Sequence, residues 1–209
     1  MADEQKATTL TRARFQNAYA GQAPWDIGEP QPVFRALADG VVGSILDAGC
    51  GTGENALFFA ARGHAVTGFD FLEEAIESAK RKAVERGIIA TFLVQDALKL
   101  REWAVQFDNV IDSGLFHVFS DEDRVLYVLG LKAVLKREGR LFLACFSDQT
   151  PGTQGPRRVS QIELRDAFAE GWEIESIDAA QFEVRPEARQ ALFSDENPRA
   201  WLLVATRTS

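Results

Sequence analysis

Glycine residues at alternate positions follow a short apolar run in the first quarter of the chain. Gly49, Gly51 and Gly53 come directly after a run that ends in Asp47 and Ala48, and a second apolar run ends in Asp70. Glycine is needed where a strand turns abruptly and its backbone lies against a ligand, because a Cβ would block that approach. An acid that closes the second strand is the residue with which nucleotide-binding α/β folds hold a ribose. The pattern predicts a site for an adenosine-containing cofactor.

The residue at position 54 distinguishes a dinucleotide from other adenosine-containing cofactors. The dinucleotide fingerprint G-x-G-x-x-G needs a third glycine where this chain has Glu54. A helix N-terminus attracts anions such as pyrophosphate, but Asp47 and Glu54 would repel one, and no nearby lysine or arginine offsets them. These acids suit a ligand with a cationic or amino-acid end. S-adenosylmethionine has an ammonium and a sulfonium but no phosphate, so it is the predicted cofactor.

Residues 46–53, Leu-Asp-Ala-Gly-Cys-Gly-Thr-Gly, resemble the first motif of class I S-adenosylmethionine-dependent methyltransferases in its D-x-G-x-G-x-G form. The alternatives are a different nucleotide or a glycine turn with only a structural role. The resemblance implies an enzyme that produces S-adenosylhomocysteine and uses no metal ion. It also implies cofactor-binding residues on the entry segment and at the ends of successive strands: Trp25, Asp47, Gly49, Cys50, Gly51, Gly53, Asp70, Phe71, Asp96, Ala97, Asp112 and Ser113.

The resemblance gives these residues different roles. Asp47 and the glycine backbone would hold the methionine end of the cofactor. Asp70 would accept hydrogen bonds from the ribose hydroxyls, and Phe71 would flank the adenine. Asp96 would accept from the adenine amine beside the small residue Ala97. The structural alternatives are that Asp47 caps the loop and that Asp96 is a turn residue.

Strand-like and helix-like segments alternate along the chain, which indicates an α/β sheet with helices on both faces. The expected strands lie near 44–48, 65–69, 90–94, 107–111, 140–146, 172–180 and 200–207, and the expected helices near 54–62, 72–86, 121–134 and 160–169. The last two strands, joined by a non-helical connection, suggest an antiparallel hairpin. The predicted fold is the three-layer, Rossmann-like class I methyltransferase fold, with a seven-stranded, mostly parallel sheet. Residues 1–40 would form an N-terminal helix and lid segment, and residues 41–209 the methyltransferase core of a single domain.

Composition agrees with a compact enzyme. The 209 residues are 46% hydrophobic, enough for one buried core. The net charge of -8 argues against a nucleic-acid partner, which would need a basic face. Cys50 and Cys145 are too few for a disulfide framework and are interpreted as reduced packing residues. Residues 1–10 lack the apolar run of a signal peptide, and no stretch is long enough to span a membrane. A cytoplasmic monomer or homodimer is expected.

The residues after the fourth strand constrain the methyl acceptor. The sequence Asp-Ser-Gly-Leu-Phe-His at 112–117 lacks the Pro-Pro-aromatic pattern of exocyclic-amine methyltransferases, and the chain lacks the Pro-Cys nucleophile used on cytosine. Nucleic-acid methylation is therefore disfavoured by motif as well as by charge. His117 is the candidate general base, since its ordinary pKa suits proton transfer near neutral pH. The alternative is a packed, structural histidine, because an acceptor that is already ionised needs no base.

Two further segments are candidates for the substrate pocket. Residues 24–32, rich in proline and containing Trp25, resemble the N-terminal lid of thiopurine, halide or thiol, and heterocycle or quinone methyltransferases. The loop 146–158 is long enough to be functional, and Arg157 or Arg158 would meet an anionic group. The alternatives are a tryptophan that only plugs a gap and a loop that is only a surface excursion. The proposed pocket residues are Trp25, Phe116, His117, Phe146 and Arg157.

These observations predict transfer of a methyl group from S-adenosylmethionine to an oxygen, nitrogen or sulfur of a small aromatic or heterocyclic molecule. One alternative is a thiol or halide methyltransferase, and another is a methyltransferase-like module that binds the cofactor without chemistry. An NAD-dependent oxidoreductase is disfavoured by Glu54 and by the lack of a catalytic Tyr/Lys pair near the site. No membrane partner is expected.

Overall fold

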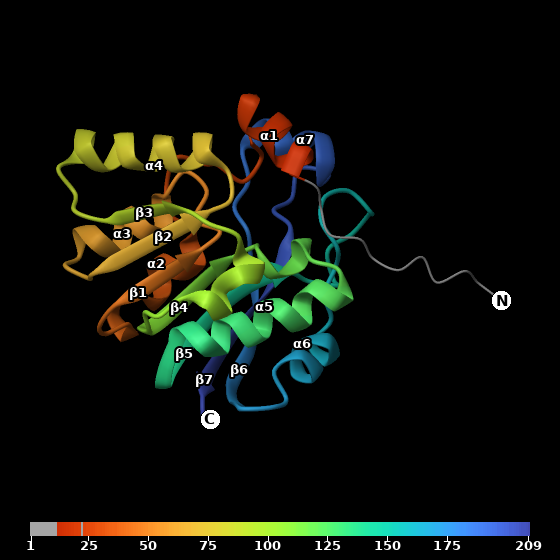
Figure 1. Ribbon diagram of the computed structural model, residues 1–209. Helices are drawn as coiled ribbons and strands as arrows, with labels where there is room; N and C mark the ends of the chain where they lie inside the picture. The colour runs from red at the N-terminus through yellow and green to blue at the C-terminus, as the bar shows by residue number, and fades with distance from the viewer. Residues whose placement is uncertain (1–11, 22) are drawn as a thin grey trace.

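The computed structural model describes residues 12–21 and 23–209. Residues 1–10, for which the sequence indicated no signal peptide, lie outside the described residues. A single seven-stranded sheet in the order β3-β2-β1-β4-β5-β7-β6 runs through the molecule (Figure 1). The strands are β1 (Ile45–Ala48), β2 (Val66–Asp70), β3 (Thr91–Val94), β4 (Phe107–Ser113), β5 (Leu135–Phe146), β6 (Trp172–Gln181) and β7 (Arg199–Arg207).

The first five strands are parallel, so their carboxyl ends meet at one edge of the sheet. β1 pairs with both β2 and β4, and the register places Asp47 beside Gly68 on one side and Ile111 on the other. β7 runs antiparallel between β5 and β6. The predicted class I methyltransferase topology, with its antiparallel C-terminal pair, is confirmed.

Helices cover both faces of the sheet because the buried strands are apolar on both sides. The helices are α1 (Arg12–Ala20), α2 (Pro32–Leu37), α3 (Glu54–Ala61), α4 (Glu73–Arg86), α5 (Asp121–Val134), α6 (Gln161–Ala167) and α7 (Pro186–Leu192), with short 3-10 turns η1 (Ala38–Gly40), η2 (Ala97–Glu102) and η3 (Phe116–Val118). One core cluster contains Tyr127 and Leu131 of α5, and the other contains Phe59 of α3 and Ile76 of α4. Alternate residues of β1 enter the two clusters, so the sheet is the middle of three layers.

Local sequence accounts for the ends of the helices that position the site. Ser120 caps α5 by accepting a hydrogen bond from the backbone N–H of Asp123, and Ser160 forms a capping box with Glu163 at α6. Gly87 ends α4 in the left-handed conformation, as expected for a residue after a helix. These caps fix where each helix begins or ends beside the sheet.

The expectation of a non-helical connection between the last two strands is wrong. The connection contains α7, a seven-residue helix that begins with Pro186. Proline at a helix start is favourable, since its missing N–H has no partner there in any case. No residue of α7 is buried, so the segment lacks the apolar periodicity by which helices are recognised.

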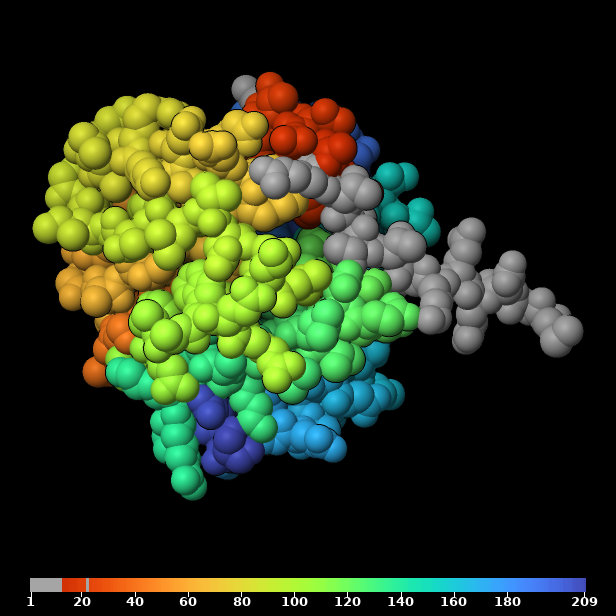
Figure 2. Space-filling model, in the orientation of Figure 1, coloured from red at the N-terminus to blue at the C-terminus, as the bar shows by residue number. Residues whose placement is uncertain are grey.

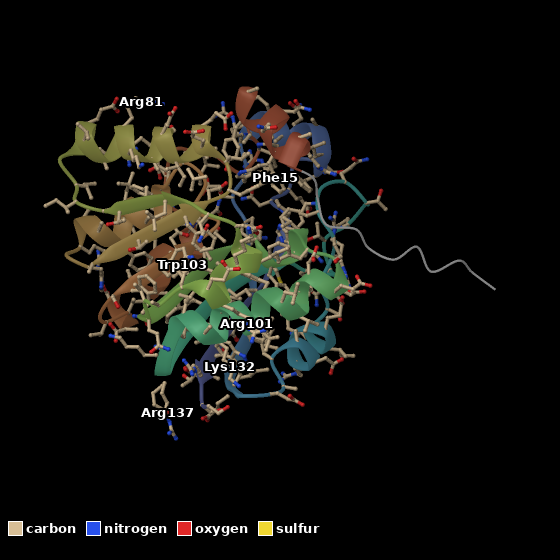
Figure 3. The ribbon with its side chains drawn as sticks, viewed as in Figure 1. Phe15, Arg81, Arg101, Trp103, Lys132 and Arg137 are labelled. Atoms are coloured by element: carbon tan, nitrogen blue, oxygen red, sulfur yellow. The ribbon has the colours of Figure 1, made fainter. Side chains whose placement is uncertain are left out.

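The N-terminal segment lies across the edge of the sheet where the parallel strands end. Figure 2 shows α1, in red, beside the yellow start of α4. Phe15 lies on the side of α1 that faces the sheet, and Arg137 projects at the opposite end of the molecule (Figure 3). Across the described residues, each helix is too short or too polar to cross a bilayer.

Candidate active site

A pocket of about 420 Å³ opens at the carboxyl ends of the parallel strands. This is the edge at which open α/β sheets bind their ligands. Its walls come from α1, the segment after it, the glycine loop, the ends of β2 to β5 and the connection between β6 and β7. Eleven of the residues predicted from the sequence line it: Trp25, Gly49, Cys50, Gly51, Asp70, Phe71, Asp96, Ala97, Ser113, His117 and Phe146.

The glycine loop keeps one wall of this pocket free of side chains. Gly51 has a φ of 52°, and a Cβ on it would lie 2.5 Å from the hydroxyl oxygen of Tyr19. The carboxylate of Asp70 accepts hydrogen bonds from the backbone N–H of Gly51 at 3.1 Å and of Leu72 at 3.0 Å. Asp70 therefore holds the loop in shape, and it also lies on the pocket wall.

Gly53 has a packing role and does not line the pocket. It adopts a φ of 87°, and a Cβ there would come within 2.8 Å of the Ala79 methyl on α4 and 3.0 Å of the Phe92 ring on β3. Its lack of a side chain lets the start of α3 approach these elements closely. The conformation of the glycine loop depends on this close packing of α3 against α4 and β3.

Glu54 has basic partners, contrary to the expectation that no lysine or arginine offsets it. Lys82 and Arg86 of α4 each donate a hydrogen bond to its carboxylate at 2.7 Å. These ion pairs offset burial and hold the pKa of Glu54 below its usual range. Because α4 returns beside α3, residues about thirty positions apart meet. Glu54 is therefore no longer an argument against an anionic ligand.

Asp47 is the buried acid without a partner. Its side chain is 1% exposed, and neither carboxylate oxygen has a hydrogen-bond partner in normal geometry. Burial raises the pKa of Asp47 to about 8, and the charges of Asp112 and Asp70 also raise it. The nearby backbone N–H of Ala56 favours the charged form and partly offsets this rise. Asp47 lies behind the glycine loop rather than on the pocket wall. A cation at the loop would supply the missing interaction.

Asp112 organises the turn after β4 and does not line the pocket. Its carboxylate accepts hydrogen bonds from the backbone N–H of Leu115 at 2.7 Å and of Phe116 at 3.0 Å, and from the Tyr127 hydroxyl at 2.9 Å. Burial raises the pKa of Asp112 to about 7, and these three donors partly offset the rise. The carboxylate is thus committed to the fold, while Ser113, Gly114 and Leu115 of this turn line the pocket.

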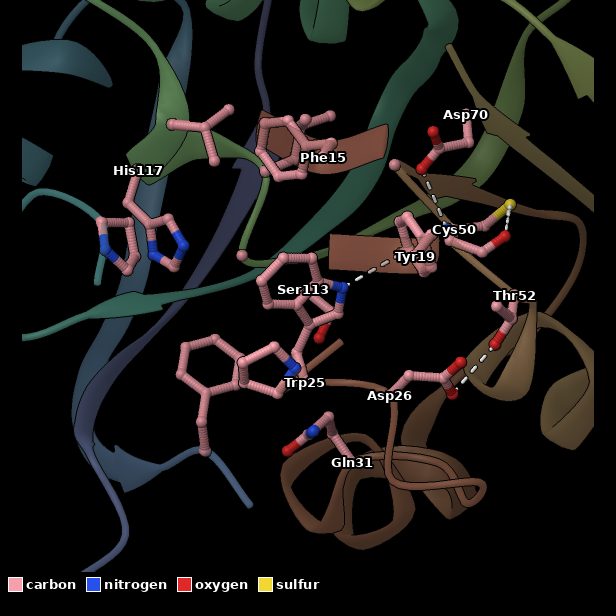
Figure 4. A pocket seen from close by; sticks show the side chains of 18 of the residues that line it. Phe15, Tyr19, Trp25, Asp26, Gln31, Cys50, Thr52, Asp70, Ser113 and His117 are labelled. Atoms are coloured by element: carbon pink, nitrogen blue, oxygen red, sulfur yellow. Dashed lines mark hydrogen bonds between the residues drawn. The ribbon is translucent and has the colours of Figure 1, made fainter. Parts of the chain in front are cut away.

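Aromatic side chains form the wall across from the glycine loop. The ring of Phe146 lies 5.0 Å from that of His117, 5.4 Å from Phe182 and 5.9 Å from Phe193, measured between centroids. In Figure 4, His117 lies on one side of the pocket and Cys50 and Asp70 on the other. A flat molecule placed between the aromatic side chains and the glycine loop would contact ring faces and edges at one end and the loop backbone at the other.

His117 is held in a neutral state. Its Nδ1 accepts a hydrogen bond from the backbone N–H of Phe146 at 2.9 Å. Burial lowers the pKa of His117 to about 3, and the positive charges of Arg124 and Arg158 lower it further. The imidazole is therefore uncharged at neutral pH.

Two residues predicted for the substrate pocket lie outside it. Phe116 is fully buried, with its ring 5.8 Å from Phe168 and the Arg124 guanidinium 4.5 Å from its centroid. Arg157 pairs with the carboxylates of Asp121 and Glu163. In the turn η3, successive side chains point to different sides, so His117 reaches the pocket and Phe116 the core. Arg157 is already neutralised.

The segment after α1 also lines the pocket, with Pro24, Trp25, Asp26 and Ile27. The Trp25 indole N–H donates to the Tyr19 hydroxyl at 3.0 Å, and its ring lies edge-on to Phe15 and Tyr19 (Figure 4). The Trp25 side chain is nevertheless 41% exposed. The Thr52 hydroxyl donates to Asp26 at 3.0 Å, which ties this segment to the glycine loop.

Comparison with known proteins decides the family. A family model described as a methyltransferase domain matches residues 45–139. The chain is 33% identical to the 2-heptyl-1-hydroxyquinolin-4(1H)-one methyltransferase of Mycobacteroides abscessus, over 92% of this chain and 96% of that protein. The chain belongs to the class I S-adenosylmethionine-dependent methyltransferases.

Solved structures agree with this assignment. One similar structure comes from work on the conversion of a disulfide bond into a thioacetal group during echinomycin biosynthesis. It is 36% identical to this chain, with a TM-score of 0.82, and the match covers 95% of this chain and 93% of that one. The 1,6-didemethyltoxoflavin-N1-methyltransferase of Burkholderia thailandensis, solved with S-adenosylhomocysteine, is 20% identical with a TM-score of 0.69 over 100% of this chain and 98% of that one, and so shares the fold.

S-adenosylmethionine is the cofactor of this methyltransferase. The residues present fit it. A Cβ at Gly49 would lie 3.1 Å from the Leu115 side chain, so the loop there has only room for backbone. The unpartnered carboxylate of Asp47 behind the loop suits a ligand with an ammonium group.

Sequence reasoning missed two parts of the methyltransferase pocket. Phe15 and Tyr19 of α1 line it, as do Phe182 and Phe193 beside α7. The first pair was recognisable as aromatic residues one helical turn apart, at i and i+4. The second pair gave no such signal, because the connection that holds it was not predicted to be helical.

Proposed function

We propose that this methyltransferase transfers a methyl group from S-adenosylmethionine to a heteroatom of a small, planar aromatic or heterocyclic molecule, with oxygen or a ring nitrogen as the preferred acceptor. The observation that supports this most directly is the aromatic wall of Phe146, Phe182 and Phe193, which lines the pocket beside His117. Aromatic rings favour offset or edge contacts with other rings. A flat substrate would therefore be held with its edge toward the cofactor.

The proposed cofactor contacts follow the order of the strands. Asp70 accepts from the ribose hydroxyls, Phe71 flanks the adenine, and Asp96 receives the adenine amine beside Ala97. Asp47 acts on the ammonium group through the loop. When bound, S-adenosylmethionine supplies a methyl group on a positively charged sulfur, which a lone pair on the acceptor attacks in line. Orientation of the two reactants can supply much of the rate enhancement.

The proposed role of the N-terminal segment is that of a lid. Residues up to 40 would cover the two ligands and exclude water, and residues 41–209 would form the core. The hydrogen bond from Thr52 to Asp26 supports this, since it joins the segment to the glycine loop.

The names of the relatives support a heterocyclic acceptor. One is named for a hydroxyquinolinone, and the structural neighbour from Burkholderia is named for a toxoflavin precursor, which was bound in its crystal. Both names describe fused, nitrogen-containing rings. The aromatic wall of this chain would accommodate a molecule of that class.

The test is a methyl-transfer assay with isotope-labelled S-adenosylmethionine and a panel of acceptors. The panel contains 2-heptyl-1-hydroxyquinolin-4(1H)-one, substituted phenols, aromatic thiols and halide ions. We expect labelled product from the quinolinone or a phenol, and a KM raised about two- to tenfold in Phe182→Leu, the loss expected for one aromatic contact. Phe58→Leu, a matched change outside the pocket, should leave KM unchanged. No turnover of any planar acceptor would refute the proposal.

A sulfur acceptor is the second candidate. The structure from echinomycin biosynthesis comes from work on a disulfide and a thioacetal, and it is 36% identical to this chain. The aromatic thiols of the panel distinguish the two. Faster turnover of a thiol than of the matching phenol, at a pH where both are ionised, would favour this reading.

Cellular location and assembly are part of the proposal as well. A cytoplasmic protein, present as a monomer or a homodimer and without nucleic-acid partners, agrees with the net charge of -8. Light scattering of the purified chain would give its mass in solution.

A further inference from the structure

We infer that His117 recognises a negatively charged oxygen on the methyl acceptor by donating a hydrogen bond from Nε2, and that it does not remove a proton. This inference rests on the proposed function and narrows its substrate class. It starts from the hydrogen bond that already occupies Nδ1.

The backbone fixes the tautomer of His117. The peptide N–H of Phe146 can only donate, so Nδ1 must supply a lone pair to it at 2.9 Å. A neutral imidazole carries one proton, and that proton is therefore on Nε2. The Nε2 atom can donate a hydrogen bond but has no lone pair with which to accept a proton.

The Nε2 edge of the ring lies beside the end of β4. A Cβ built on Gly114 would be 3.3 Å from Nε2 and 3.2 Å from Cε1 of His117. Gly114 and Ser113 line the same pocket as His117. Nε2 has no hydrogen-bond partner among the residues that the structure describes. Figure 4 shows the ring on the pocket wall, facing the side on which Trp25 lies.

Two guanidinium groups, those of Arg158 and Arg124, act electrostatically on His117. Arg158 lies 5.3 Å from the centroid of the Phe146 ring and donates to the backbone carbonyls of Thr150, Pro151, Gly152 and Pro156. In the described part of the chain no carboxylate forms an ion pair with it.

Arg124 is the second cation, and Glu163 lies 3.4 Å from it. Both positive charges oppose protonation of His117. The same field favours a negative ligand.

These features select an acceptor that binds as an oxyanion. Suitable molecules are aromatic or N-hydroxylated heterocycles whose hydroxyl is largely ionised near neutral pH. A lone pair of the oxyanion forms the new O–C bond, the C–S bond breaks, and its electrons go to sulfur, which becomes a neutral thioether. No proton is transferred in this step, so no base is required.

The first test compares His117→Gln, which keeps a donor near Nε2, with His117→Leu, which removes it. The probes are 4-nitrophenol and 2-heptyl-1-hydroxyquinolin-4(1H)-one, titrated into enzyme saturated with S-adenosylhomocysteine between pH 6 and pH 9. Above the acceptor's pKa, we expect His117→Leu to bind about ten- to a hundredfold more weakly, the loss of one hydrogen bond to a charged group. His117→Gln should recover most of this. His64→Gln changes the other histidine, outside the pocket, and should behave as wild type.

A base would give the opposite pattern. Both His117 variants would then lose methyl transfer equally, and both would recover at a pH where the acceptor is ionised in solution. That result would overturn the inference. The proposed function would fail differently, with wild-type enzyme binding S-adenosylhomocysteine but methylating no planar acceptor.

A measurement on the wild-type protein is independent of how the variants fold. The chain has two histidines, so nitrogen-15 NMR of labelled histidine, assigned with His64→Gln, resolves His117. We expect the neutral Nε2–H tautomer throughout pH 6 to 8. A charged ring, or a proton on Nδ1, would overturn the inference.

Discussion

The unpartnered acid behind the glycine loop makes the apo protein less stable as pH rises. Asp47 is 1% exposed, and burial raises its pKa to about 8 from the ordinary value near 4. The folded state therefore keeps a proton that the unfolded chain has lost. Stability from this group is fully present below about pH 4 and is lost progressively up to about pH 8. Asp47→Asn replaces the acid by a neutral group of similar shape and removes this loss.

The size of the effect follows from the two pKa values. Between pH 5 and pH 7, Asp47 is ionised in the unfolded chain and protonated in the folded one. Each pH unit then lowers the free energy of unfolding by about 1.4 kcal/mol, or about 2.7 kcal/mol over the interval. The stability of Asp47→Asn relative to wild type should increase by this amount. Asp112, whose pKa is raised to about 7, adds a similar slope to both proteins, and its contribution cancels in the difference.

Urea unfolding of both ligand-free proteins at pH 5, 6 and 7 measures this difference. Asp108→Asn is the control, since Lys136 and Ser44 lower the pKa of Asp108 to about 2. That group gains its stabilising charge above about pH 4, so its removal should lower stability by a constant amount across the interval. Parallel curves for wild type and Asp47→Asn would refute the account of Asp47.

Three further outcomes are expected. Gly51→Ala should weaken binding of S-adenosylhomocysteine at least tenfold in calorimetry. The added Cβ would lie 2.5 Å from the Tyr19 hydroxyl, and position 51 has a left-handed φ. Unchanged affinity would be inconsistent with the loop as a wall of the cofactor site. Tyr127→Phe should lower the free energy of unfolding by about 1–3 kcal/mol in urea, since the buried Asp112 loses its hydroxyl donor. Binding of S-adenosylmethionine at pH 7 should release protons as Asp47 ionises, detected as a dependence of calorimetric enthalpy on buffer; the same enthalpy in all buffers would contradict this.

The order and type of most elements could be predicted from the sequence because they depend on local signals. The glycines at 49, 51 and 53 mark the end of β1, and Gly87 marks the end of α4. Strand ends bring most of the predicted cofactor residues to one pocket, since parallel strands bring their carboxyl ends to one edge.

The remaining features depend on contacts between distant residues. The ion pair of Glu54 with Lys82 links residues 28 positions apart, and no local pattern indicates it. Phe116 and His117 are adjacent and both suited to a pocket, but only the packing of Phe116 against Phe168 decides which one reaches it. The tautomer of His117 depends on Phe146, 29 residues later, in another strand.

The position of β7 inside the sheet has a consequence for how the chain is made. β7 is the last strand in the sequence, but it pairs with β5 over residues 140–146 and with β6 on its other side. During synthesis β5 therefore has an open edge, and such edges favour aggregation. Phe182 and Phe193 of the aromatic wall lie between β6 and β7, so they are anchored only when β7 docks. We expect the nucleoside half of the pocket to form before β7 has been synthesised and the acceptor half to form only after β7 has emerged from the ribosome.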